Sequence, residues 1–137
     1  GSELGEAPRA VPADLDEFPD YRDRIAARGE TPVYKRPICR GPIEVSDLSS
    51  LEIDIANLEA AAAAAGVETA FLTSASPGVI AVFQPNEYYP SQTAYLYALG
   101  EAMKTEYETI SASVLLLQIA CPDLAMGRHL KYRNEHV

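Results

Sequence analysis

The sequence is poor in cysteine and in basic residues, and it contains no apolar run long enough to cross a bilayer. Two cysteines, Cys39 and Cys121, are too few for a disulfide framework in 137 residues, so we expect free thiols in a reducing cytoplasm. Eleven basic residues against 20 acidic ones give a formal net charge of −9. Such a surface repels nucleic acid phosphates and anionic membranes, so we expect neither partner. The N-terminus lacks the basic-then-apolar pattern of a secretion signal.

The rest of the composition is that of an ordinary globular protein, with 47% hydrophobic and 23% charged residues. The length suits one domain with one core. Residues 1–36 are predicted to form an irregular lead-in, because it is interrupted by Pro8, Pro12, Pro19 and Pro32. One short helix is expected within it, from about Asp20 to Arg28. The α/β part is predicted to span residues 37–137.

Three strands are predicted. The first covers Arg36–Val45, and its ladder is expected to end near Arg40 because Pro42 lacks a backbone donor. The second covers Glu68–Leu72, which is short and apolar. The third covers Val114–Ile119, whose continuous apolar run is typical of a strand buried on both faces.

Two helices are predicted between these strands. The first begins at Ser49, which has capping-box spacing to Glu52, and ends at Gly66, a favourable C-cap residue. The second runs from Ser91, a suitable N-cap, to Ser111. One face of the second helix is apolar through Tyr95, Leu96, Leu99, Met103, Tyr107 and Ile110.

The predicted order of strand, helix, strand, helix, strand indicates a parallel sheet with right-handed crossovers. Three parallel strands are few for a free-standing domain, and the edge strands stay open to further pairing. We therefore expect that a second chain completes the sheet or that this chain self-associates.

Four segments resemble one known family. Residues 121–129 read Cys-Pro-Asp-Leu-Ala-Met-Gly-Arg-His, the most specific of the four, and the others are residues 36–42, 71–80 and 88–91. Through them the chain, from about Leu15 to His129, resembles the cobalamin-independent methionine synthase family, above all its shorter single-barrel members. The resemblance implies a TIM-type (β/α)8 barrel with its site at the C-terminal ends of the strands. This chain would be a β-α-β-α-β section of that barrel, incomplete on its own.

The resemblance also implies a chemistry. Better-known members of the family transfer a methyl group from a folate to a thiol, and a zinc ion holds the substrate sulfur as a thiolate. The His-x-Cys pair that binds this zinc is absent from the sequence, so zinc is expected from residues outside this chain. Ala120 stands where the family has an aspartate that contacts the substrate's amino group, which argues against an amino-acid substrate.

Cys121 and Asp123 are the predicted catalytic residues, because they directly follow a strand's C-terminal end. The Cys121 thiol suits a nucleophile or a soft metal ligand, and the alternative is a small buried residue. His129 follows eight positions later. These residues are too few for a complete metal site, so no metal ligand is assigned within the chain.

Ser74, Ser76 and Gly78 are predicted to bind substrate. Their hydroxyl and amide groups suit a carboxylate or a phosphate, while the alternative is an ordinary turn made by Pro77 and Gly78.

Three further substrate-binding candidates are Asn86, Arg128 and His129. Asn86 is expected either to face a ligand in the complete barrel or to pack its loop onto the long helix. Arg128 is expected either to neutralise an anionic substrate or to pair with an acidic residue.

The leading hypothesis is a non-autonomous part of a methionine-synthase-like enzyme that transfers an alkyl group to a small thiol or another small anionic substrate. A second hypothesis is a catalytically silent subunit that stabilises a full-length homologue. A third is a small enzyme that keeps the barrel pocket but no longer uses zinc, with Cys121 or Asp123 acting on the substrate directly. Zinc content and the reactivity of the Cys121 thiol distinguish the three.

Overall fold

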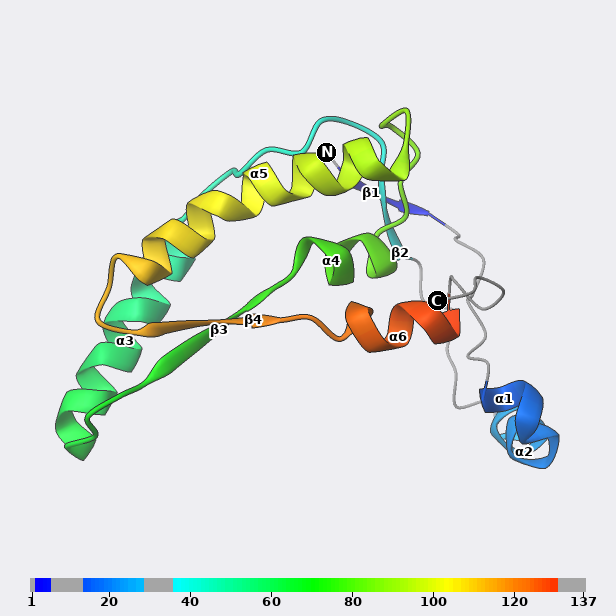
Figure 1. The fold of residues 1–137 in the computed structure, drawn as a ribbon, viewed down its shortest axis with the longest axis horizontal. Helices are drawn as coiled ribbons and strands as arrows, with labels where there is room; N and C mark the ends of the chain where they lie inside the picture. Colours follow the sequence, from blue (N-terminus) through cyan, green and yellow to red (C-terminus); the bar gives the residue numbers. More distant parts are fainter. Residues whose placement is uncertain (1, 6–13, 29–35, 131–137) are drawn as a thin grey trace.

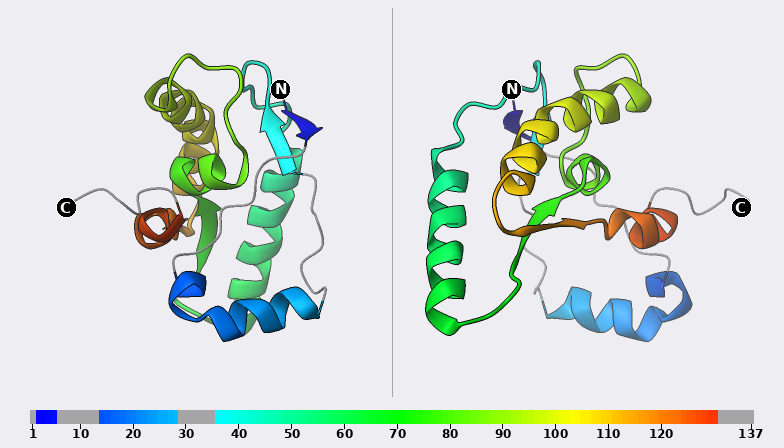
Figure 2. Two further views of the ribbon diagram at one scale, coloured as in Figure 1. Left: turned by 90° about the vertical axis from the view of Figure 1, so that its right-hand side faces the viewer. Right: turned by 60° about the vertical axis from the view of Figure 1, so that its left-hand side comes forward.

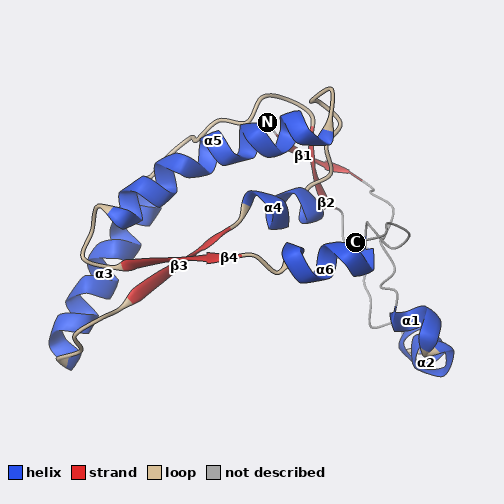
Figure 3. Cartoon of the chain, viewed as in Figure 1, coloured by secondary structure: helices blue, strands red, loops and turns tan. Residues whose placement is uncertain are grey.

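The computed structural model describes residues 2–5, 14–28 and 36–130, whose arrangement is shown in Figure 1. The strands are β1 (Ser2–Gly5), β2 (Arg36–Cys39), β3 (Phe71–Ala75) and β4 (Leu116–Ala120). The helices are α1 (Asp14–Glu17), α2 (Pro19–Ala27), α3 (Ser49–Ala65), α4 (Pro77–Phe83), α5 (Gln92–Ser111) and α6 (Asp123–Leu130). Helices make up more of the chain than strands do (Figure 3). The predicted α/β class is therefore confirmed.

The lead-in contains more regular structure than predicted. The helix expected from Asp20 to Arg28 is present as α2, displaced by one residue, and α1 precedes it. Strand β1 pairs antiparallel with β2, with Ser2 opposite Cys39. The sequence pattern gave no signal for β1, because four residues are too short to show an alternation of apolar and polar side chains.

Strands β3 and β4 form a parallel pair in register. Phe71 lies opposite Leu116, and Ala75 lies opposite Ala120. Helices α4 and α5 connect the two strands: α4 follows the C-terminal end of β3, and α5 returns along the pair and contacts both strands (Figure 1). Parallel strands need such a long crossover, which explains why α5 extends over 20 residues.

The predicted third strand of this parallel sheet does not join it. In the described part of the chain, β3 pairs with β4 alone, and β2 pairs with β1 in a separate sheet. The Cys39 N–H donates to the Pro85 carbonyl at 2.9 Å, and the Glu87 N–H donates to the Cys39 carbonyl at 2.9 Å. These bonds hold the end of β2 beside residues 85–87, after α4, and not beside β3. The prediction of one sheet of three parallel strands is therefore wrong.

One face of the β3–β4 pair is covered and the other is open. Leu72 and Leu117 pack toward α3 and α5, as part of a hydrophobic cluster. Their neighbours Phe71 and Leu116 point to the opposite face, where they are 57% and 59% exposed. The expectation that residues 114–119 are buried on both faces is therefore wrong, because the described helices that pack on the pair, α3 and α5, cover one face.

Helix α3 begins at the predicted residue but is capped differently. Leu48 occupies the N-cap position and makes no side-chain capping bond, so the predicted capping box of Ser49 and Glu52 is wrong. Instead, the Asp47 carboxylate accepts hydrogen bonds from the Ser49 N–H at 2.9 Å and from the Ser49 hydroxyl at 2.5 Å. Gly66 ends the helix as predicted, with a left-handed φ of 66° that favours glycine.

The predicted turn at residues 73–78 is instead the junction of a strand and a helix. Strand β3 continues to Ala75, three residues beyond its predicted end. Ser76 then caps α4, because its Oγ accepts a hydrogen bond from the Val79 N–H at 3.0 Å. Pro77 occupies the first helical turn, where its missing N–H costs nothing. The sequence suggested a turn because proline followed by glycine is common in both settings.

Helix α5 connects two hydrophobic clusters. The Tyr95 cluster comprises Cys39, Tyr95 and Leu99, and the Ile110 cluster comprises Ile55, Ile110 and Leu115. The burial of Tyr95, Leu99 and Ile110 confirms the predicted apolar face of this helix. Figure 2 shows that only the C-terminal end of α5 approaches α3, where Ile110 packs with Ile55. The chain is therefore built around one long helix with a small core at each end.

No helix in the described ranges combines the length and the apolar character that a membrane span needs.

Tyr95 is expected to make the fold sensitive to alkaline pH. Burial, with smaller contributions from Cys39 and Tyr89, raises the pKa of Tyr95 to about 12. Its hydroxyl donates to the Gln84 carbonyl at 2.8 Å. Below about pH 10 the phenol is neutral in the folded and the unfolded chain, so its contribution is complete. Above pH 10 the unfolded chain ionises first, so the free energy of unfolding should fall by about 1 to 2 kcal/mol by pH 12.

The Tyr95→Phe variant checks this by urea unfolding at several pH values. It should be less stable than the parent at pH 8, and its free energy of unfolding should fall less between pH 10 and pH 12. Tyr97→Phe is the matched control, because Tyr97 is 74% exposed and should leave the alkaline loss unchanged. An equal alkaline loss in the parent and in Tyr95→Phe would contradict the assignment.

Candidate functional site

The candidate site lies where β3 and β4 end. Because the two strands are parallel and in register, their C-terminal residues Ala75 and Ala120 lie side by side. The Ser76 N–H extends the ladder by one bond, donating to the Ala120 carbonyl at 3.0 Å. Helix α4 starts directly after β3, and α6 starts three residues after β4, at Asp123. The two helices contact one another, so both helix starts converge on this edge.

A hydrogen bond between Ser76 and Asp123 connects the two helix starts. The Ser76 hydroxyl donates to Asp123 Oδ1 at 2.6 Å, while its oxygen accepts from the Val79 N–H. Ser76 is only 5% exposed, although it is polar. The two side chains were predicted separately, as substrate-binding and catalytic residues, and the structure brings them together.

Gly78 is part of the same contact. A Cβ atom built on Gly78 would lie 2.0 Å from Asp123 Oδ2, so the carboxylate rests directly on the glycine backbone. Gly78 therefore makes room for the Asp123 side chain. Any ligand at this position would have to displace that carboxylate.

Helix α5 supplies two polar contacts to the same strand ends. The Ser74 hydroxyl, 3% exposed, donates to Glu106 Oε1. The Tyr107 hydroxyl donates to the Ala75 carbonyl at 2.6 Å. Burial raises the pKa of Tyr107, and the neighbouring Glu106 and Cys121 raise it further. Tyr107 is therefore a neutral hydrogen-bond donor at neutral pH.

Sequence reasoning missed both contributions of α5. The sequence pattern places Tyr107 on the apolar face of this helix and does not single out Glu106. A signal was present for Tyr107, since a tyrosine on an apolar helix face usually directs its hydroxyl to a polar partner. Glu106 gave no such signal, because acidic residues are common on this chain and only the fold places Glu106 against Ser74.

Cys121 follows β4 at the same edge and is partly exposed. Its thiol donates a weak hydrogen bond to the Ile119 carbonyl at 3.6 Å. The position agrees with the predicted place of a reactive group after a strand. Cys39 is also free, but it is fully buried in the Tyr95 cluster.

Of the remaining predicted site residues, Asn86 is not brought into this contact. Asn86 folds back on its own turn: its Nδ2 donates to the Tyr89 carbonyl at 2.9 Å, and its Oδ1 accepts from the N–H groups of Tyr88 and Tyr89. Arg128 and His129 belong to helix α6, but their side chains lie outside the described part of the structure.

The described side chains at this edge do not form a metal site. Among the described residues, no three histidine, cysteine, aspartate or glutamate side chains lie close enough together to hold one. Cys121 and Asp123 thus find no third ligand in this part of the chain.

Comparison of the chain with protein-family models, with curated proteins and with solved structures finds no match. The resemblance noted from the sequence therefore stays a prediction.

Gly78→Ala is expected to break the link between α4 and α6. The new Cβ would displace the Asp123 carboxylate and with it the bond from Ser76, which should lower the free energy of unfolding by about 1 to 2 kcal/mol. Gly100→Ala is the matched control, since nothing lies within 4 Å of a Cβ built there. In the middle of α5 that change should stabilise by about 0.5 to 1 kcal/mol.

Urea unfolding of both variants measures the difference. If Gly78→Ala were as well tolerated as Gly100→Ala, the close packing of Asp123 on Gly78 would be wrong.

Proposed function

We propose that this chain is one part of an α/β enzyme whose sheet is completed by a second chain, and that the complete enzyme transfers an alkyl group to the sulfur of a thiol. The open, uncharged face of the β3–β4 pair is the observation that carries the proposal. The reaction class comes from the resemblance of residues 121–129 to methionine-synthase-like enzymes, and the open face supports the two-chain assembly.

The open face consists of three pairs of residues that face each other in register. These are Phe71 with Leu116, Thr73 with Gln118, and Ala75 with Ala120. None of them is charged, although the chain carries a net charge of −9. Parallel sheets are normally covered on both faces, and a two-stranded sheet is rarely stable alone. A second layer of protein, supplied by a partner chain, is therefore the simplest way to cover this face.

The residues after the strands suit a site in such an assembly. The face opposite the helices is the one that lines the interior of a barrel, and barrel enzymes place reactive groups where strands end. Cys121 stands at that place with a free thiol. In alkyl transfer, a bond forms between the acceptor sulfur and the alkyl carbon while the carbon's bond to the donor breaks. The donor keeps the electron pair and takes up a proton.

Within this proposal, the residues of this chain hold in place the strand ends that border the site. The hydroxyl of Tyr107 and the paired Ser76 and Asp123 fix the ends of β3, β4 and both following helices. The zinc ion of the proposed reaction belongs to the partner chain, because the described residues do not form a metal site.

One observation favours a second candidate, a catalytically silent subunit. Ser76 and Asp123 satisfy each other, and Asp123 is packed against Gly78, so neither is free to meet a substrate. In this candidate the strand-end contacts are purely structural. The chain would then stabilise a catalytic partner through the same open face.

Substitution of the open face should weaken the assembly. Phe71→Ser and Leu116→Ser each remove a large apolar contact, worth about 1.5 to 3 kcal/mol, so each should weaken association about 10- to 100-fold. Light scattering of the purified chain, together with its zinc content, measures the effect. Tyr97→Ser is the control, because Tyr97 is also a large exposed side chain but lies on α5, away from the open face.

A compact monomer without zinc and without a co-purifying chain would overturn the proposal. A complex that holds zinc would support the alkyl-transfer candidate, and a complex without zinc would favour the silent subunit.

The reactivity of Cys121 separates the two candidates further. In a Cys39→Ser background, the complex would be treated with iodoacetamide at pH 7, and the denatured chain would serve as the reference thiol. A catalytic Cys121 should react at least about tenfold faster than that reference, since reactive cysteines lie in sites that favour the thiolate. Reaction slower than the reference would favour the silent subunit.

A further inference from the structure

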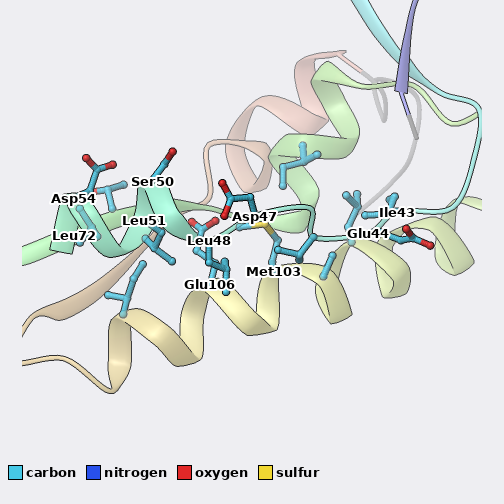
Figure 4. A pocket seen from close by; sticks show the side chains of 16 residues that line it. Ile43, Glu44, Asp47, Leu48, Ser50, Leu51, Asp54, Leu72, Met103 and Glu106 are labelled. Atoms are coloured by element: carbon cyan, nitrogen blue, oxygen red, sulfur yellow. The ribbon is translucent and has the colours of Figure 1, made fainter. Parts of the chain in front are cut away.

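A groove separates the two hydrophobic clusters on the helical side of the chain. Helix α5 forms one wall, whose apolar part is called the floor. The segment of residues 43–48 with the start of α3 forms the opposite wall (Figure 4). Its volume is about 510 Å³, within the range of pockets that hold small organic molecules. The groove lies mainly on the covered side of β3, and it shares Glu106 with the strand-end contacts and Thr73 with the open sheet face.

The floor of the groove is apolar. Leu99 comes from the Tyr95 cluster, Ile110 from the Ile110 cluster, and Met103 lies between them on α5. Leu48 and Leu51 face them from the opposite wall. A ligand that fills the groove would therefore join the two clusters into one continuous apolar surface.

The charged groups of the groove are all carboxylates. They are Glu44, Asp47, Asp54 and Glu106, and none of the 16 lining residues is a lysine, an arginine or a histidine. The side-chain ion pairs of the described residues involve other carboxylates, those of Asp23, Glu87 and Glu108. The groove thus combines an apolar floor with negative charge that this part of the chain does not neutralise.

Two of these carboxylates are held in place by hydrogen bonds. Ser49 donates to Asp47 through both its hydroxyl and its N–H, which lowers the pKa of Asp47 and keeps it ionised at neutral pH. The buried Ser74 hydroxyl donates to Glu106 from β3. Asp47 and Glu106 come from opposite walls of the groove (Figure 4). A positive group between the walls would meet fixed negative charge on both sides.

We propose that the groove between α3 and α5 binds a small organic cation, an ammonium group attached to an apolar body. The apolar body lies on the floor formed by Leu99, Met103 and Ile110. The ammonium group lies between Asp47 and Glu106. Charge complementarity selects this ligand over a neutral or an acidic molecule of the same size, and the volume of the groove suits a small molecule.

The test uses three probes that share a phenyl group: 2-phenylethylamine, 2-phenylethanol and 3-phenylpropionate. The full 137-residue chain, in whatever assembly it forms, is titrated with each probe by calorimetry and by NMR. The amine should bind about tenfold more tightly than the alcohol, and the acid should not bind measurably. The resonances of Leu48 and Met103 should shift with the amine.

Charge-removing variants locate the site. Asp47→Asn and Glu106→Gln should each weaken binding of the amine about two- to fivefold, the usual size of a partly exposed ion pair, and should leave binding of the alcohol unchanged. Glu101→Gln is the matched control, because it removes the same charge from α5 outside the groove and should have no effect. Ala102→Phe should fill the groove and abolish binding of both the amine and the alcohol.

Two results would overturn the proposal. Equal affinity for the amine and the alcohol would show that the carboxylates do not select a cation. An equal loss of affinity for the amine in Glu101→Gln and in Asp47→Asn would show that the amine is attracted to the acidic surface as a whole. Neither result depends on the strand-end site, so the proposed enzyme function would be unaffected.

Discussion

The parallel pairing of β3 with β4 is the constraint on which the rest of the described structure depends. Two parallel strands need a long connection from the end of one to the start of the other, and α4 with α5 supplies it. The same pairing brings both strand ends to one edge, so Ser76 and Asp123 meet although 47 positions separate them. The helix that closes the crossover also carries Glu106 and Tyr107 to that edge.

Because α5 lies on one side of the β3–β4 pair, the pair has a covered face and an open face. On the covered face, α5 joins the Tyr95 cluster to the Ile110 cluster and leaves the acidic groove between them. On the open face, Phe71 and Leu116 remain exposed. The burial of apolar area that stabilises a sheet is therefore only partly achieved within the chain. This asymmetry is the physical basis for proposing a partner chain.

The two proposed sites differ in how far their polar groups are already satisfied. At the strand ends, the Asp123 carboxylate accepts a hydrogen bond from Ser76 and packs directly on Gly78, so this contact mainly joins α4 to α6. In the groove, Asp47 and Glu106 accept hydrogen bonds from serines but face no positive charge within the described residues. Unneutralised charge over an apolar floor favours ligand binding more strongly than a satisfied pair does.

The sequence by itself determined the α/β class, the existence of α3 and α5, the apolar face of α5 and the helix end at Gly66. These features follow from local periodicity and from the backbone freedom of glycine, which act within a few residues. Only the tertiary structure decided that β2 pairs with β1, that the strand after α5 is half exposed, and that Ser76 meets Asp123. Strand partners and side-chain contacts across long separations depend on how whole elements pack, and no short pattern encodes that packing.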